Sequence, residues 1–259
     1  MSIISSRDNP RVRRWRELAR DARERRKQRR ALIEGSNLIS AFLASGRTVE
    51  SLVLGKSAAE GLQFDSLVKQ SGKSPVVLSD VLFRYVSDTE APAGIAAEIA
   101  IPSGQQHLKT AGACVFLDAI QDTGNVGTIL RSAAAFGIRH AVLGKGCADA
   151  WSPKVLRAAA GAHFSLQISE NTDLAEAIAE FAGSIACTVP RGGVPVSEAA
   201  LAGRIGWLFG AEGQGVREAL AARAALKVTI PMPGGAESLN VAAAAAICFY
   251  EFSRRGARA

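Results

Sequence analysis

The sequence has few residues of the kinds that build metal cages, disulfide frameworks or histidine-based active sites. Four cysteines, three histidines and two methionines occur in 259 residues. The cysteines, at positions 114, 147, 187 and 248, lie far apart and mostly within apolar runs, which indicates buried free thiols rather than a metal site or a disulfide network. We therefore expect no metal ion and a reducing, cytoplasmic location.

Long apolar runs are also missing. The longest one near the C-terminus, Val241 to Tyr250, is ten residues long and stops at Glu251. A transmembrane helix needs about 20 apolar residues, so we expect no membrane span. The N-terminus is polar and rich in arginine, with no apolar segment behind the charges. We therefore expect no secretory signal there, and the interspersed acidic residues disfavour a transit peptide.

The signatures of several common enzyme classes are absent. No GxGxxG follows a first strand, and GxxxxGK[ST], HExxH and GxSxG do not occur. The three histidines, His107, His140 and His163, are isolated from one another in the sequence. These absences disfavour nicotinamide binding, P-loop nucleotide hydrolysis and hydrolysis by a catalytic triad.

Hydrophobic residues make up 48% of the chain and charged residues 21%, which predicts a folded protein with a well-buried core. Residues 1–100 predict a small α/β unit, and the polar stretch 101–112, with Pro102 and Gly104, is the expected linker. Over residues 113–259, short apolar runs alternate regularly with helical patterns. This alternation predicts an α/β domain with a mainly parallel sheet and helices on both faces.

The predicted elements follow from these patterns. In the first unit we expect helices starting at Asn9–Pro10 and spanning 34–44, 64–70 and 79–86, with strands at 49–54, 75–78 and 95–99. In the second we expect strands at 114–117, 141–143, 164–168, 185–189, 205–209 and 228–230, and helices at 126–136, 153–161, 173–181 and 216–223. Ligands of such sheets bind at the C-terminal ends of the strands.

Positive charge is concentrated in one segment. Residues 7–30 hold eleven arginines and Lys27 against four acidic residues, whereas the rest of the chain is nearly neutral. A solvated charged face is the ordinary explanation of such a run. Here the acids are too few to neutralise the cations through pairs within the helix, so an external polyanion, nucleic acid, is the favoured partner. The candidate RNA-binding residues are Arg7, Arg11, Arg13, Arg14, Arg25, Arg26, Arg29 and Arg30.

Three strand-to-loop junctions carry unusual polar residues. In the first, FLDAIQDTGNVGTILRSAAAFGI from Phe116, Asn125 occupies the expected N-cap of a helix and Arg131 lies six residues further on. An amide and a guanidinium near the positive end of a helix suit phosphate or ribose oxygens. A common cap followed by an exposed arginine would give the same pattern.

The second junction is WLFGAEGQGV, in which a strand runs into Gly210, Gly213 and Gly215 with Glu212 among them. Glycines at such a position let the backbone approach a ligand closely, although a plain glycine turn would also use them. The third is IPMPGGAESLNVAAAAAI from Ile230, where Ser238 and Asn240 bracket the start of an alanine-rich helix. Its prolines donate no backbone hydrogen bond, so the loop presents mostly carbonyl groups, which could bind the edge of an adenine ring. An ordinary capped helix of the core would give the same pattern.

In this order and spacing, the three motifs resemble the SpoU family of RNA ribose 2′-O-methyltransferases, of the SPOUT superfamily. The segment SPKVLRAAAGAHF from Ser152 extends the match, which covers residues 113 to about 251. The LIEGSNLI segment from Leu32 resembles the small substrate-binding domain of many members, which is similar to a ribosomal-protein fold. The resemblance implies S-adenosylmethionine as cofactor, a deep trefoil knot and a homodimer.

The resemblance also assigns roles to individual residues. Arg131 matches the family's catalytic arginine, which we expect to grip a phosphate or polarise the 2′-oxygen, because a guanidinium keeps its proton at neutral pH. Asn125, Ser238 and Asn240 would orient the ribose, and Glu212 would hold Arg131 or face the sulfonium. The expected cofactor-binding residues are Thr188, Gly210, Ile230, Met232 and Leu239.

Ribosomal RNA is the expected substrate, because the basic helix and the additional N-terminal domain favour it. Methylation of transfer RNA by the same chemistry is the nearest alternative. A non-catalytic RNA-binding or ribosome-assembly factor is the alternative from another class, and the complete set of polar site residues argues against it.

Overall fold

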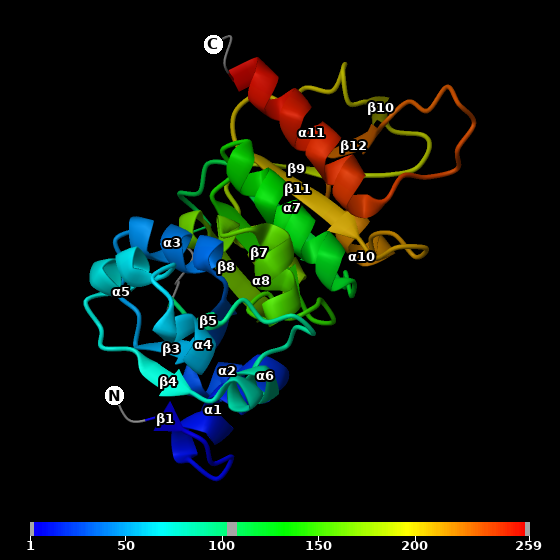
Figure 1. The fold of residues 1–259 in the computed structure, drawn as a ribbon. Helices are drawn as coiled ribbons and strands as arrows, with labels where there is room; N and C mark the ends of the chain where they lie inside the picture. Colours follow the sequence, from blue (N-terminus) through cyan, green and yellow to red (C-terminus); the bar gives the residue numbers. More distant parts are fainter. Residues whose placement is uncertain (1–2, 103–107, 257–259) are drawn as a thin grey trace. The chain divides into compact units, whose positions relative to one another are not determined.

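The structure, a computed structural model, describes residues 3–102 and 108–256 (Figure 1). Within these ranges the chain forms two compact units. The first contains residues 3–102 and 151–164, and the second contains residues 108–150 and 165–256. Part of the expected linker, residues 103–107, lies outside the described residues, as does His107.

The first unit is built on a mixed five-stranded sheet in the order β1-β4-β3-β5-β2. Its strand β5 pairs antiparallel with β2 and β3, whereas β4 pairs parallel with β1 and β3. The elements are β1 (Ile3–Ile4), α1 (Pro10–Arg20), α2 (Ala22–Gln28), β2 (Arg30–Glu34), α3 (Ser36–Ala44), β3 (Ser51–Gly55), α4 (Lys56–Glu60), α5 (Asp65–Ser71), β4 (Val76–Leu78), α6 (Asp80–Val86), β5 (Ile95–Ala100) and α8 (Pro153–Ala159).

Helix α1 confirms the expected start and the expected apolar stripe. The Asn9 side chain accepts a hydrogen bond from the Arg11 amide, and Pro10 takes the first helical position. Val12, Trp15 and Leu18 are fully buried, so the helix turns one face into the core and leaves its arginines on the other faces.

Two predicted boundaries in or beside the first unit are wrong. The expected helix from Glu34 begins at Ser36, because Glu34 ends strand β2, which the arginine-rich pattern did not predict. The expected strand over 164–168 begins only at Gln167, and Ala162–Ser165 forms a 3-10 turn instead. In both cases pairing with a neighbouring strand set the boundary, which local pattern does not contain.

The second unit is a seven-stranded sheet in the order β10-β12-β9-β11-β6-β7-β8, and its strand pairs are all parallel. This confirms the predicted α/β class. The elements are β6 (Cys114–Asp118), α7 (Thr123–Ala135), β7 (His140–Gly144), β8 (Gln167–Thr172), α9 (Leu174–Glu180), β9 (Ser184–Thr188), β10 (Val194–Pro195), β11 (Ile205–Gly210), α10 (Glu218–Ala221), β12 (Leu226–Thr229) and α11 (Val241–Gly256).

Helices cover both faces of this sheet, as expected. On strand β11, Trp207 and Phe209 face α11, where their rings lie 6.3 and 5.6 Å from that of Phe249. The residue between them, Leu208, belongs to the core cluster on the opposite face, which includes residues of α9 and α10. Alternate side chains of one buried strand thus anchor helices on opposite sides.

The four cysteines are free thiols, as expected. Burial raises the pKa of Cys187 to about 11 and that of Cys248 to about 12, and it also raises the pKa of Cys114. Thiols with raised pKa values are poor nucleophiles and poor metal ligands. In the part of the chain that the structure describes, no group of three or more potential ligand side chains could hold a metal ion, and no helix is long and apolar enough to cross a membrane.

Candidate active site

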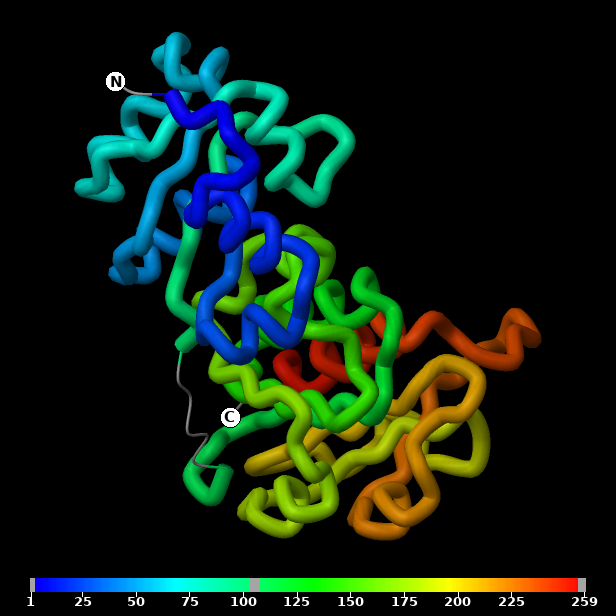
Figure 2. The backbone as a smooth tube through the Cα atoms, turned by 90° about the horizontal axis from the view of Figure 1, so that it is seen from below, coloured from blue at the N-terminus to red at the C-terminus, as the bar shows by residue number. Residues whose placement is uncertain are grey.

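A pocket of about 260 Å³ opens at the C-terminal ends of the neighbouring strands β9, β11 and β12. The glycine loop after β11 and the proline-containing loop after β12 form its walls, and that second loop extends away from the sheet (Figures 1 and 2). The position agrees with the rule for ligand sites in parallel sheets. The pocket is lined by Thr188, Val189, Pro190, Phe209, Gly210, Ala211, Glu212, Gly213, Gly215, Val216, Val228, Ile230, Met232, Ser238, Leu239, Val241 and Ala244.

All five residues expected to bind the cofactor line this pocket. Its walls combine aliphatic side chains with peptide groups that remain available to a ligand. Within residues 230–239, which the structure describes in full, the single backbone–backbone hydrogen bond joins the Gly235 amide to the Met232 carbonyl. An apolar cavity with free peptide groups at its edge suits a nucleoside-containing cofactor.

The glycine loop is closed so tightly that Gly210 has no room for a side chain. A Cβ at this position would lie 2.0 Å from the Gly215 carbonyl carbon and 2.1 Å from the Val216 amide nitrogen. The loop turns back on itself through a hydrogen bond of 2.8 Å from the Gly215 amide to the Ala211 carbonyl. The requirement for glycine at Gly210 is therefore steric, which a plain surface turn would not explain.

Beside the pocket, three polar residues from distant parts of the chain form one hydrogen-bonded network. The Asn240 side-chain amide donates to the Asn125 oxygen at 2.9 Å and to the Glu212 carboxylate at 3.4 Å. The Asn125 amide donates to the same Glu212 oxygen. The network joins α7, the glycine loop and the start of α11, so it fixes the relative positions of all three motifs.

Asn240 also caps helix α11. Its side-chain oxygen accepts from the amides of Ala242 at 2.9 Å and Ala243 at 3.3 Å, which confirms the expected helix start. The expected cap at Asn125 is wrong: the Asp122 carboxylate caps α7, at 2.7 Å from the Asn125 amide nitrogen. Asn125 lies inside the first turn, and its side chain is therefore free to join the network.

Arg131 lies apart from the network. Its side chain is exposed on α7, and no described side chain pairs with it. The expectation that Glu212 holds Arg131 is wrong for this structure, because Glu212 accepts from the two asparagine amides instead. Ser238 is exposed and lines the pocket. The structure thus brings four of the five expected catalytic residues to the pocket or its rim.

Sequence reasoning missed an ion pair that supports the glycine loop. Asp118, at the end of β6, is 1% exposed and accepts from the Arg217 backbone amide at 3.0 Å and from its side chain at 2.8 Å. A buried carboxylate is stable only when paired in this way. The pair attaches the residue after the loop to the neighbouring strand end. The signal that could have revealed it was an aspartate ending an otherwise apolar run.

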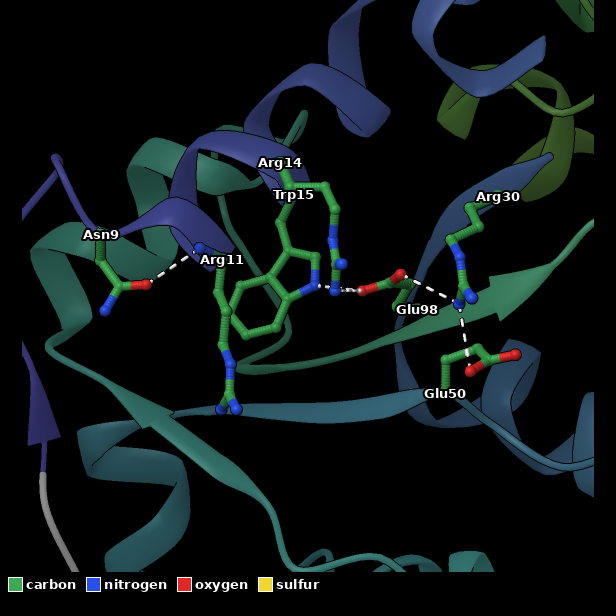
Figure 3. Close-up of polar contacts among 7 residues, drawn as sticks. All are labelled: Asn9, Arg11, Arg14, Trp15, Arg30, Glu50 and Glu98. Carbon is green, nitrogen blue, oxygen red and sulfur yellow. Dashed lines mark hydrogen bonds and ion pairs between the residues drawn. The ribbon is translucent and has the colours of Figure 1, made fainter. Parts of the chain in front are cut away.

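Several arginines of the basic segment have partners within the first unit. Arg14 and Arg30 contact the fully buried Glu98, at 2.6 and 3.2 Å, and Arg30 also contacts Glu50 at 3.1 Å (Figure 3). Trp15 donates to the same Glu98 oxygen as Arg14, at 2.8 Å. Acids within the helix are too few for these cations, as expected, but for Arg14 and Arg30 the partners are acids from distant parts of the chain and not an external anion.

The other candidate arginines differ in exposure. Arg25 is 4% exposed and donates to the Leu18 carbonyl. Arg26 and Arg29 are exposed and donate to backbone carbonyls. Arg11 and Arg13 are exposed, and their side chains have no hydrogen bond or ion pair with a described residue.

Comparisons with known proteins agree with the motifs. Residues 112–250 match the SpoU rRNA Methylase family, and residues 9–97 match the MRM3-like substrate binding domain. The chain is 34% identical over 253 residues to the 23S rRNA (guanosine(2553)-2′-O)-methyltransferase RlmP of Bacillus subtilis, an alignment that covers 96% of this chain and 98% of the relative.

Two solved structures with bound AdoMet share the fold over nearly the whole chain. The AviRb methyltransferase of Streptomyces viridochromogenes has a TM-score of 0.87 at 25% identity, covering 96% of this chain and 98% of its own. An rRNA methyltransferase of Sinorhizobium meliloti has a TM-score of 0.83 at 25% identity, covering 98% of both chains. On its motifs, its fold and these matches, the chain belongs to the SpoU rRNA methylase family.

Proposed function

We propose that this protein methylates the 2′-hydroxyl of a ribose in ribosomal RNA, with S-adenosylmethionine as the methyl donor. The observation that carries the proposal is the network of Asn125, Glu212 and Asn240 beside a pocket at the strand ends. It places polar groups for a ribose next to a cavity suited to a nucleoside-containing cofactor. The family match and the named activity of the Bacillus subtilis relative support ribosomal RNA as the substrate.

In this proposal the cofactor occupies the pocket. The backbones of Gly210, Ile230 and Leu239, which line the pocket, would hold it, and Thr188 and Met232 would lie beside it. S-adenosylmethionine supplies a methyl group activated by a positively charged sulfur. The apolar lining and the free peptide groups of the 230–239 loop fit such a molecule.

Each polar residue then has a distinct task. The Glu212 carboxylate accepts from both asparagine amides and so fixes the orientation of Asn125 and Asn240. The two asparagines, with Ser238 on the pocket wall, orient the target ribose. Arg131 serves as a cation that holds a phosphate or polarises the 2′-oxygen. Rate acceleration comes chiefly from positioning, which contributes up to about 7 to 11 kcal/mol in well-aligned systems.

The domain layout is part of the proposal. Residues 1–100 form the RNA-binding domain, 101–112 the linker and 113–259 the methyltransferase domain, a division that the two family matches support.

We also propose the trefoil knot within the last domain. Arg255, near the end of α11, donates hydrogen bonds to the carbonyls of Val196, Ser197 and Ala199. These bonds hold the last helix against the loop after β10.

Two further features complete the proposal. The protein acts as a homodimer, a proposal supported by the exposed apolar side chains of Ile247 and Tyr250, which are three residues apart on α11 and are 37% and 52% exposed. It acts in the cytoplasm, a location supported by its likeness over almost its whole length to a ribosomal RNA methyltransferase of Bacillus subtilis.

The test is methyl transfer from radiolabelled S-adenosylmethionine to deproteinised ribosomal RNA and, separately, to transfer RNA, followed by mapping of 2′-O-methyl sites. We expect label in ribosomal RNA. Label confined to transfer RNA would support the alternative substrate. Absence of S-adenosylmethionine binding by calorimetry would favour a non-catalytic assembly factor.

The role of Arg131 is tested with Arg131→Lys, because lysine keeps the charge and loses the planar guanidinium. We expect methyl transfer to fall by at least tenfold while cofactor affinity is unchanged. Arg139→Lys, another exposed arginine of the same unit, is the matched control. Full turnover of Arg131→Lys would remove Arg131 from the mechanism.

A further inference from the structure

Two arginines of the first unit stack on one aromatic ring, and a third lies one helical turn away from the second. The guanidinium carbons of Arg7 and Arg16 lie 4.6 and 4.5 Å from the centre of the Tyr85 ring. Arg16 also donates to the Tyr85 carbonyl at 2.5 Å. Arg20 lies one helical turn after Arg16 on α1 and is exposed. The cluster therefore spans the turn before α1, α1 itself and α6.

These guanidinium groups lack a carboxylate partner among the described residues. Arg14 and Arg30, by contrast, are held by Glu98 (Figure 3). Burial and the nearby charge of Arg20 lower the pKa of the Arg16 guanidinium below its ordinary value, and Arg7 acts in the same direction. Positive groups that repel one another at fixed positions are stabilised by an anion.

The arrangement has the chemistry of a phosphate site. A guanidinium presents a planar fork of N–H donors that matches two phosphate oxygens, and stacking on an aromatic ring holds that fork in place before binding. The Arg16 bond to the Tyr85 carbonyl restricts the side chain further. Binding of a phosphate at such a site therefore costs little side-chain entropy, because the side chains are already held in place.

We infer that Arg7 and Arg16, stacked on Tyr85, and the neighbouring Arg20 form a binding site for a backbone phosphate of the RNA substrate. The inference rests on the proposed function, which supplies the RNA. It adds Arg16, Arg20 and Tyr85, which the charge pattern alone had not singled out. It also separates these cations from Arg14 and Arg30, whose charge is already balanced within the fold.

The test measures the affinity for fluorescein-labelled oligo(U) and for a labelled RNA hairpin over a series of salt concentrations. We expect Arg20→Gln and the double variant Arg16→Gln/Arg20→Gln to bind both RNAs several-fold more weakly. The dependence of log Kd on log salt should fall by about 0.7 to 0.9 for each phosphate that the protein no longer neutralises. Arg23→Gln, which removes an exposed and unpaired arginine from α2, is the matched control and should bind as the wild type does.

The role of the ring is tested with Tyr85→Phe, which keeps the aromatic face, and Tyr85→Ala, which removes it. We expect the first to retain affinity and the second to lose it. If wild-type protein binds RNA and methylates it while Arg20→Gln and the double variant match Arg23→Gln, the phosphate site is refuted and the proposed function stands. If the wild type neither binds nor methylates RNA, the proposed function fails as well. The thermal unfolding temperature of each variant is measured as well, so that weaker RNA binding can be distinguished from loss of the folded structure.

Discussion

Gly210 lies at the end of β11, where the returning glycine loop passes over it. A methyl group there would overlap the Gly215 carbonyl and the Val216 amide, both of which are backbone atoms and cannot rotate away. The cost of any side chain is therefore a displaced loop, together with the pocket wall that this loop forms.

Gly210→Ala should weaken cofactor binding by at least tenfold and destabilise the protein by about 1 to 3 kcal/mol. Calorimetric titration with S-adenosylmethionine and urea unfolding measure the two effects. Gly234→Ala is the matched control, because Gly234 has open space around it and lies outside the pocket lining. Equal affinities for the two variants would contradict the steric argument.

At the scale of elements, helix α11 begins at a residue with two tasks. The Asn240 oxygen caps the helix, and its amide nitrogen donates to Asn125 and Glu212. Aspartate can perform the first task but not the second, since it has no amide donor and would bring a second negative charge to Glu212. The two tasks can therefore be separated by substitution.

Asn240→Asp should keep α11 capped, yet lose at least tenfold in methyl transfer. Asn240→Ala should lose the cap as well, at a cost of about 0.5 to 2 kcal/mol in the free energy of unfolding. Methyl transfer and urea unfolding are measured for both variants. A fully active Asn240→Asp would show that the bonds to Asn125 and Glu212 serve only to place the helix.

At the scale of the whole molecule, the exposed apolar side chains of α11 bear on the proposed dimer. We expect light scattering after size-exclusion chromatography to give twice the chain mass of 27.1 kDa. Ile247→Arg should shift the protein towards monomer, since a charge would be buried in the interface. Leu62→Arg, at a residue 82% exposed in the first unit, is the control and should leave the mass unchanged. A wild-type protein that is monomeric at all concentrations would refute the dimer.

Much of the fold was predictable because it depends on local patterns. The apolar stripe of α1, the buried strands of the second sheet and the capped start of α11 each follow from the order of a few neighbouring residues. Strand β2 was missed because its apolar core of three residues follows directly on the arginine run. It becomes a strand by pairing antiparallel with β5, whose partner residues lie more than sixty positions away.

Taken by itself, the sequence determined the α/β class and the order of the site motifs, because periodicity and motif spacing are properties of the chain. The resemblance of those motifs to a known family indicated five of the residues that line the pocket. Only the tertiary structure decided which groups meet. It paired Glu212 with Asn125 and Asn240 rather than with Arg131, and it joined Asp118 to Arg217. It also balanced Arg14 against the distant Glu98. Side-chain hydrogen bonds and ion pairs act over a few ångströms in space, and separation along the chain does not predict them.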